Sequence, residues 1–188
     1  MKKPIFKKIL KVVKRQFKYI FKKNKKLIIC FVGIPCSGKT RLAKILEEKY
    51  KGVRVNDDDL RKVIDKFVNE NKRETILKEF LLDFLRNYSY KNELVILDSG
   101  IERKYEDIAE ISKNKKWKMF IIRVVAEKNL ILERIKKKDR NRFENRYEDI
   151  ERWFKEYKEF NKNKKVDFTF RGDKDLEDLY PRLDTVLS

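Results

Sequence analysis

The segment "GIPCSGKT", residues 33–40, has residue types and a spacing suited to holding phosphate groups. It matches the pattern G-x-x-x-x-G-K-[ST], in which the glycines let successive backbone N–H groups turn inward around phosphate oxygens. In such a loop Lys39 reaches the terminal phosphates of a nucleotide, and the Thr40 hydroxyl binds Mg²⁺. The predicted nucleotide-binding residues are Gly33, Pro35, Cys36, Ser37, Gly38, Lys39, Thr40 and Arg41.

Three consecutive carboxylates, Asp57 to Asp59, follow a short apolar run in "VRVNDDDLR", residues 53–61. In an open α/β sheet, ligands bind beyond the carboxyl ends of the parallel strands, so these side chains can approach the same phosphates. Aspartate also suits the N-cap and the first turn of a helix. A cap does not require three aspartates, and the pattern leaves both a catalytic role and a capping role open.

Another acidic residue, Asp98, ends the apolar run "LVILDSG", residues 94–100. We expect it either to order the ligand shell of a Mg²⁺ ion held by Thr40 or to be an ordinary turn residue. Further along, "LERIKKKDRNRFENR", residues 132–146, concentrates arginines between two predicted helices. Such a segment is either a solvated run of charge or a basic lid that closes over phosphates.

Alternating strands and helices are predicted to position these residues. Short apolar runs predict strands at 26–33, 53–56, 93–100, 117–126 and 166–170. Amphipathic spacing predicts helices at 40–52, 58–68, 73–90, 102–114, 127–137 and 146–160, and a short last helix disturbed by Pro181. We expect Gly52 to form the left-handed cap of the first of these helices. The alternation predicts an α/β fold of the P-loop NTPase type, a five-stranded parallel sheet with helices on both faces.

The pair "GIPCSGKT" and "NDDDLR" resembles the P-loop kinases that include polynucleotide kinases and zeta-toxin kinases, over roughly residues 27–160. The resemblance implies that Asp58 accepts the proton of an attacking hydroxyl, with Lys39 and a lid arginine, Arg134, stabilising the transferred phosphate. It also implies that Arg61 and Arg103 contact the acceptor. A capping role for Asp58 and a solvated helix surface for both Arg103 and Arg134 remain the alternatives.

Two positions depart from the pattern of these kinases. Cys36 stands where glycine is usual, either as a small filler of the loop or as a reactive thiol whose pKa is lowered by Lys39 and the amides. Asp57 stands where polynucleotide kinases often have a basic residue. The extra negative charge of Asp57 beside the acceptor site weakens the expectation of a nucleic-acid acceptor.

The first 26 residues differ from the rest in composition. They hold twelve lysine and arginine residues and no acidic residue, in a chain of 188 residues with a formal net charge of +19. Apolar residues at helical spacing between 4 and 23 predict a basic amphipathic helix, which can bind RNA, DNA or an anionic membrane, or pack on the domain. We expect two regions, this arm (residues 1–26) and a P-loop kinase domain (residues 27–188).

Composition also excludes several kinds of chemistry. The chain has no histidine, which excludes Ser-His-Asp triads and histidine-ligated zinc. Its two cysteines, Cys30 and Cys36, make no disulfide framework and indicate a reducing compartment. No apolar stretch approaches the roughly 20 residues of a membrane-spanning helix. We expect a cytoplasmic protein, with the arm as a candidate for peripheral membrane attachment.

Two hypotheses for function follow. The first is a kinase that uses ATP and Mg²⁺ to phosphorylate a hydroxyl group on the 5′ end of a nucleic acid, on a nucleotide or on a sugar nucleotide. The second is an ATP-binding switch whose nucleotide state alters the binding of the arm to RNA or to a membrane. The presence of both Asp58 and Arg61 favours the kinase, because a switch does not need an acceptor site.

Overall fold

The computed structural model describes residues 26–87, 94–138 and 147–188. The predicted arm lies outside these ranges except for Lys26, and the middle of the predicted lid, residues 139–146, also lies outside them. The helical form of the arm and its binding partners therefore stay predictions. Within the described ranges, no helix combines the length and the apolar character needed to cross a bilayer.

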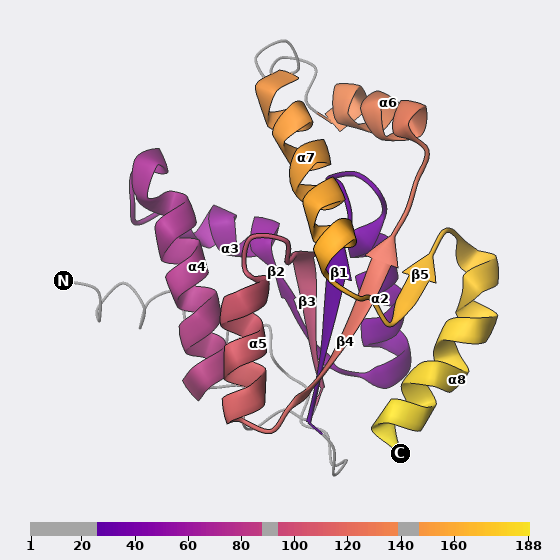
Figure 1. Ribbon diagram of the computed structural model, residues 1–188. Helices are drawn as coiled ribbons and strands as arrows, with labels where there is room; N and C mark the ends of the chain where they lie inside the picture. The colour runs from indigo at the N-terminus through magenta and orange to yellow at the C-terminus, as the bar shows by residue number, and fades with distance from the viewer. Residues whose placement is uncertain (1–25, 88–93, 139–146) are drawn as a thin grey trace.

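Five parallel strands in the spatial order β2-β3-β1-β4-β5 form the centre of the fold (Figure 1). The strands are β1 (Leu27–Val32), β2 (Val53–Asn56), β3 (Leu94–Gly100), β4 (Lys118–Val124) and β5 (Phe168–Phe170). All six residues of the central strand β1 are buried, because helices cover both faces of the sheet. The predicted α/β architecture is confirmed.

Helices lie in layers on the two faces of the sheet (Figure 1). They are α2 (Lys39–Tyr50), α3 (Asp57–Ile64), α4 (Glu70–Asn87), α5 (Tyr105–Asn114), α6 (Lys128–Lys138), α7 (Tyr147–Asn163), the 3₁₀ turn η3 (Asp173–Asp175) and α8 (Leu176–Leu187). One core joins α3, α4 and α5 to the sheet, and a second core joins α2 and α8 to its other face. A smaller cluster packs α6 and α7 on Ile34 of the loop after β1. The predicted lid helices therefore lie over the phosphate loop.

Two local predictions are wrong. Lys51 (φ 54°), and not Gly52, adopts the left-handed conformation at the end of α2. Gly52 instead permits close packing, because a Cβ there would lie 2.7 Å from the Leu94 side chain. The last helix, α8, continues through Pro181 without interruption, since its buried leucines hold it on the sheet while the proline removes a single backbone donor.

Candidate active site

The loop between β1 and α2 has the backbone geometry of an anion-binding nest. Cys36 (φ 66°) and Gly38 (φ 113°) lie in the left-handed region, the backbone conformation from which anion-binding nests are built, while the N–H of Ser37 between them closes the turn on the carbonyl oxygen of Ile34 at 3.1 Å. Gly38 is also the N-cap of α2, so the positive end of that helix adds to the field at the loop. A Cβ on Gly33 would lie 2.6 Å from the carbonyl oxygen of Val124, so β4 approaches too closely for a larger residue.

The side chain of Lys39 folds back over this loop. Its Nζ donates to the carbonyl oxygens of Gly33 at 2.5 Å and of Ile34 at 2.9 Å. Burial lowers the pKa of Lys39, and the nearby carboxylates, Glu102 first among them, partly oppose that shift. Bound phosphates would supply the negative charge that this partly buried ammonium favours.

The Thr40 hydroxyl is held from behind by Asp98. Thr40 Oγ1 donates to Asp98 Oδ1 at 2.9 Å, while Asp98 Oδ2 accepts from Arg54 Nη1 and Asn56 Nδ2, both at 2.6 Å. Asp98 is buried at the end of β3, and Arg54 and Asn56 come from the neighbouring strand β2. With both oxygens engaged, Asp98 orients Thr40, and the hydroxyl is the better placed ligand for a metal.

These residues fit a magnesium–triphosphate group. The loop combines a left-handed backbone at Cys36 and Gly38 and the start of α2 with the Lys39 ammonium, which suit phosphates, and with the Thr40 hydroxyl oxygen, which suits Mg²⁺. In the part of the chain that the structure describes, no group of three or more acidic, cysteine or histidine residues could hold a metal ion alone. Mg²⁺ normally binds through one or two protein oxygens plus phosphates, and this donor set matches that preference.

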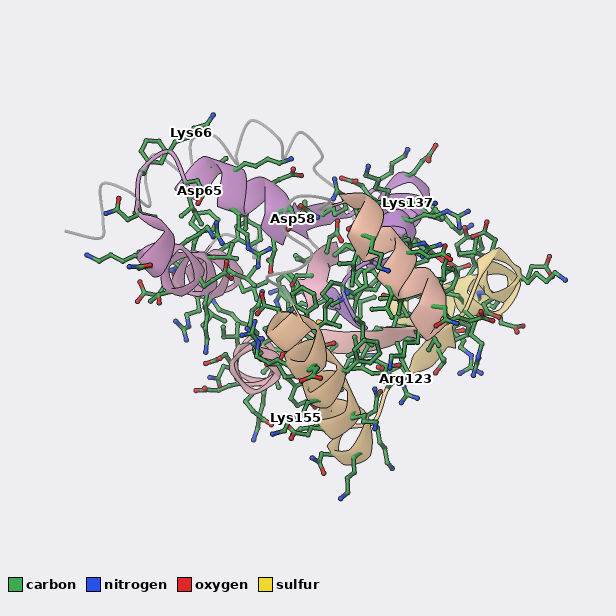
Figure 2. All side chains as sticks on the ribbon, turned by 90° about the horizontal axis from the view of Figure 1, so that it is seen from above. Asp58, Asp65, Lys66, Arg123, Lys137 and Lys155 are labelled. Carbon is green, nitrogen blue, oxygen red and sulfur yellow. The ribbon has the colours of Figure 1, made fainter. Side chains whose placement is uncertain are left out.

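The first turn of α3 separates the roles of its aspartates. Asn56 is the N-cap, because its side-chain oxygen accepts the N–H of Asp59 at 2.9 Å. Capping therefore does not explain Asp57 and Asp58. The Asp58 side chain is 57% exposed, lines the cleft above the phosphate loop and acts electrostatically on Lys39. In the view from above, Asp58 lies at the inner end of α3, whereas Asp65 lies at its outer end (Figure 2).

Asp57, in contrast, is buried and paired. Its Oδ2 lies 2.6 Å from Nζ of Lys104, from the segment between β3 and α5, and its side chain is only 9% exposed. The negative charge that the sequence places beside the acceptor site is thus compensated by Lys104. Asp57 therefore gives no physical reason to disfavour a nucleic-acid acceptor, because its pair with Lys104 is close to neutral as seen from the cleft.

Arginines from several elements surround the same cleft, which has a volume of about 1340 Å³. Arg134 of α6 donates from Nη1 to the carbonyl oxygen of Cys36 at 3.1 Å, so this lid arginine reaches the phosphate loop. Arg61 pairs with Glu74 of α4 at 2.8 Å and with Asp58 at 2.9 Å. Arg103 pairs with Glu156 of α7 at 2.7 Å, and Arg41 pairs with Asp173. The structure therefore brings Arg41, Arg61, Arg103 and Arg134 to one cleft, and the lid arginines between residues 139 and 146 lie outside the described residues.

The other predicted nucleotide-binding residues, Pro35, Ser37 and Gly38, line this cleft as well. Ser37 is buried, and its Oγ has no hydrogen-bond partner within the described residues. The loop therefore retains donor capacity, as a site for an anion requires.

Comparison with known families identifies the fold. The family model AAA_33, described as an AAA domain, matches residues 28–160. The chain belongs to this family. A comparison with curated proteins found no match.

Solved structures similar to this AAA domain include two kinases and a toxin-antitoxin system. The structure of the PezAT toxin-antitoxin system of Streptococcus pneumoniae has a TM-score of 0.65 at 12% identity and covers 89% of this chain and 76% of its own. Shikimate kinase from Acinetobacter baumannii has a TM-score of 0.57 at 17% identity, and the match covers 88% of this chain and 97% of the kinase. The Mycobacterium tuberculosis APS kinase CysC has a TM-score of 0.55 at 13% identity, and the match covers 87% of this chain and 98% of the kinase. At these identities the likeness establishes the P-loop kinase fold alone.

Sequence reasoning missed three residues of this AAA domain's site: Arg54, Glu102 and Lys104. Their partners lie far away in the sequence, so no local spacing reveals them. Arg54 alone had a detectable signal, because a charged residue inside the short apolar strand "VRVN" requires a buried partner.

Proposed function

We propose that this AAA-domain protein is a kinase that transfers the γ-phosphate of ATP to a hydroxyl group of an acceptor. One observation carries the proposal. The phosphate loop and the exposed carboxylate of Asp58 line the same cleft. A nucleotide switch needs the loop, but it needs no exposed carboxylate facing the position of the terminal phosphate.

Each residue has a defined task in this proposal. The loop amides and Lys39 hold the phosphates, and Asp98 orients Thr40 toward the metal. Bound Mg²⁺ supplies charge neutralisation on the phosphate oxygens. Asp58 orients the acceptor hydroxyl and takes its proton, while Arg134, already in contact with the loop, stabilises charge that develops on the transferred group.

For the acceptor, we propose a hydroxyl of a nucleic acid 5′ end, a nucleotide or a sugar nucleotide. Arg61 and Arg103 line the cleft and are the proposed acceptor-binding residues, and each is held by a glutamate of a different helix. These pairs fix the planes of the two guanidinium groups, which suits recognition of a phosphate or carboxylate on the acceptor.

A labelled-phosphate assay tests the proposal. The protein is incubated with γ-labelled ATP, Mg²⁺ and a panel of hydroxyl acceptors, and labelled products are identified by mass spectrometry. We expect transfer to an acceptor, and Asp58→Asn to lower its rate by about 10²-fold or more, the contribution of a positioned acid–base group. The control is Asp65→Asn, the exposed C-cap residue at the far end of α3, which does not line the cleft and should leave the rate within about twofold.

The opposite outcome is equally clear. Label that appears only as free phosphate, at a rate that Asp58→Asn does not change, would rule out the transfer reaction and favour the nucleotide switch.

A further inference from the structure

The segment after β3 folds back onto the start of the phosphate loop. The N–H of Ile101 donates to the carbonyl oxygen of Phe31 at 3.1 Å, which continues the pairing of β3 with β1. One residue later, Glu102 Oε1 accepts the N–H of Gly33 at 2.9 Å. A carboxylate from a distant part of the chain thus holds the first residue of the loop.

Glu102 reaches this position because residue 100 has no side chain. A Cβ on Gly100 would lie 2.5 Å from Oε2 of Glu102. The backbone of Gly100 is outside the left-handed region, so an alanine there would be tolerated by the backbone and would displace the carboxylate. Burial raises the pKa of Glu102, which shows that the carboxylate occupies an unfavourable place for a charge.

Gly33 is the point at which Glu102 can act on the nucleotide site. Its N–H is held by Glu102, and its carbonyl oxygen accepts from Nζ of Lys39 at 2.5 Å. Fixing the N–H fixes the turn that presents this carbonyl and the amides that follow. The Glu102 side chain lines the cleft beside the loop, and its direct contact with the loop is the hydrogen bond that it accepts from Gly33.

We propose that Glu102 is a positioning residue for nucleotide binding, which holds the phosphate loop in its binding conformation through the N–H of Gly33. This inference rests on the proposed use of ATP. It concerns affinity for the nucleotide and is independent of the acceptor.

Equilibrium binding of ATP·Mg²⁺, measured by titration calorimetry on the full chain, provides the test. Glu102→Ala should weaken binding by about tenfold, the effect of losing one hydrogen bond to a charged group. Glu102→Gln keeps an acceptor oxygen and should stay within about threefold of the wild type. Glu110→Ala, on the exposed surface of α5, is the matched control and should have no effect.

A double-mutant cycle with Gly100 separates positioning from general damage to the fold. Gly100→Ala should weaken ATP binding to an extent similar to Glu102→Ala, because it displaces the same carboxylate. In the Glu102→Ala background, the same substitution at Gly100 should have no further effect. In steady-state kinetics, KM for ATP should rise in the single variants while kcat at saturating ATP changes little.

Three results would overturn the inference: wild-type affinity in Glu102→Ala, equal weakening by glutamine and alanine, or a full additional effect of Gly100→Ala in the double variant. If Glu102→Ala does not fold, Glu102→Gln and Gly100→Ala carry the test, and wild-type affinity in Gly100→Ala then overturns it. A wild-type protein that does not bind ATP would contradict the proposed function itself. ATP binding that none of the variants alters would contradict only the role of Glu102.

Discussion

Replacing Arg54 with methionine tests how the fold supports the Thr40 hydroxyl. The side chain of Arg54 is 16% exposed and that of Asp98 is 1% exposed, and the two charges lie 2.6 Å apart. Arg54 also donates to Glu47 of α2 at 2.7 Å, which ties β2, β3 and α2 together behind the phosphate loop. Methionine retains much of the apolar stem but removes the cation that is hydrogen-bonded to the Asp98 carboxylate.

The expected loss of stability follows from this burial. Removing one partner of a buried ion pair costs roughly 3–5 kcal/mol, because the remaining charge is uncompensated. Asn56 and Thr40 still donate to Asp98, so we expect the lower end, about 3 kcal/mol. At roughly 2–4 °C per kcal/mol for a chain of this size, the melting temperature should fall by about 6–12 °C. Glu47 adds little, since its side chain is partly exposed.

Urea unfolding followed by circular dichroism measures the effect. The control is Arg152→Met, the same substitution in an exposed pair with Asp149, which should cost less than about 1 kcal/mol. Adding Asp98→Asn to Arg54→Met should restore part of the lost stability, because it removes the uncompensated charge. A loss below about 1 kcal/mol for Arg54→Met, or simple additivity in the double variant, would refute this reasoning.

Two further predictions concern the phosphate loop directly. Arg134→Met should lower kcat by at least about tenfold with a smaller change in ATP affinity. Lys137→Met, at an exposed position on the same helix (Figure 2), should leave kcat unchanged. Equal effects of the two substitutions would contradict a specific role of Arg134 in the transfer step. A maleimide should label Cys36 and spare Cys30 in the native state up to about pH 9, because Cys30 is fully buried and burial raises its pKa. Saturating ATP·Mg²⁺ should slow the labelling of Cys36, and an unchanged rate would place the nucleotide elsewhere.

The architecture and the phosphate loop were predictable because their signals are local. Apolar runs such as residues 27–32 must be strands buried on both faces, and the strand–loop–helix order around "GIPCSGKT" is contiguous. The strand order was not predictable, since it depends on which strands pair across the sheet. The end of α2 shows the limit of residue preferences, because Lys51 takes the left-handed position and Gly52 is required by packing on Leu94.

The site was predictable in its composition but not in its pairing. The sequence leaves the roles of the three aspartates open, and three structural contacts separate them. Asn56 supplies the helix cap, Lys104 neutralises Asp57 from 47 residues away, and Asp59 pairs with Lys62 on its own helix. Asp58 is exposed in the cleft and pairs with Arg61, a predicted acceptor-binding residue. A carboxylate's role in such a cluster depends on its ion partner, and ion partners from other strands leave no trace in local spacing.

Charge pairing divides the cleft into two sides with different physical properties. On the acceptor side, Arg61, Arg103 and Lys104 are each held by a carboxylate of the chain. Lys39 differs, because its partly buried ammonium donates to two carbonyl oxygens, which carry no full negative charge. A polyanion such as the triphosphate of ATP therefore gains most at the loop. Recognition of the acceptor depends instead on the geometry of Asp58 and of arginines that are already oriented.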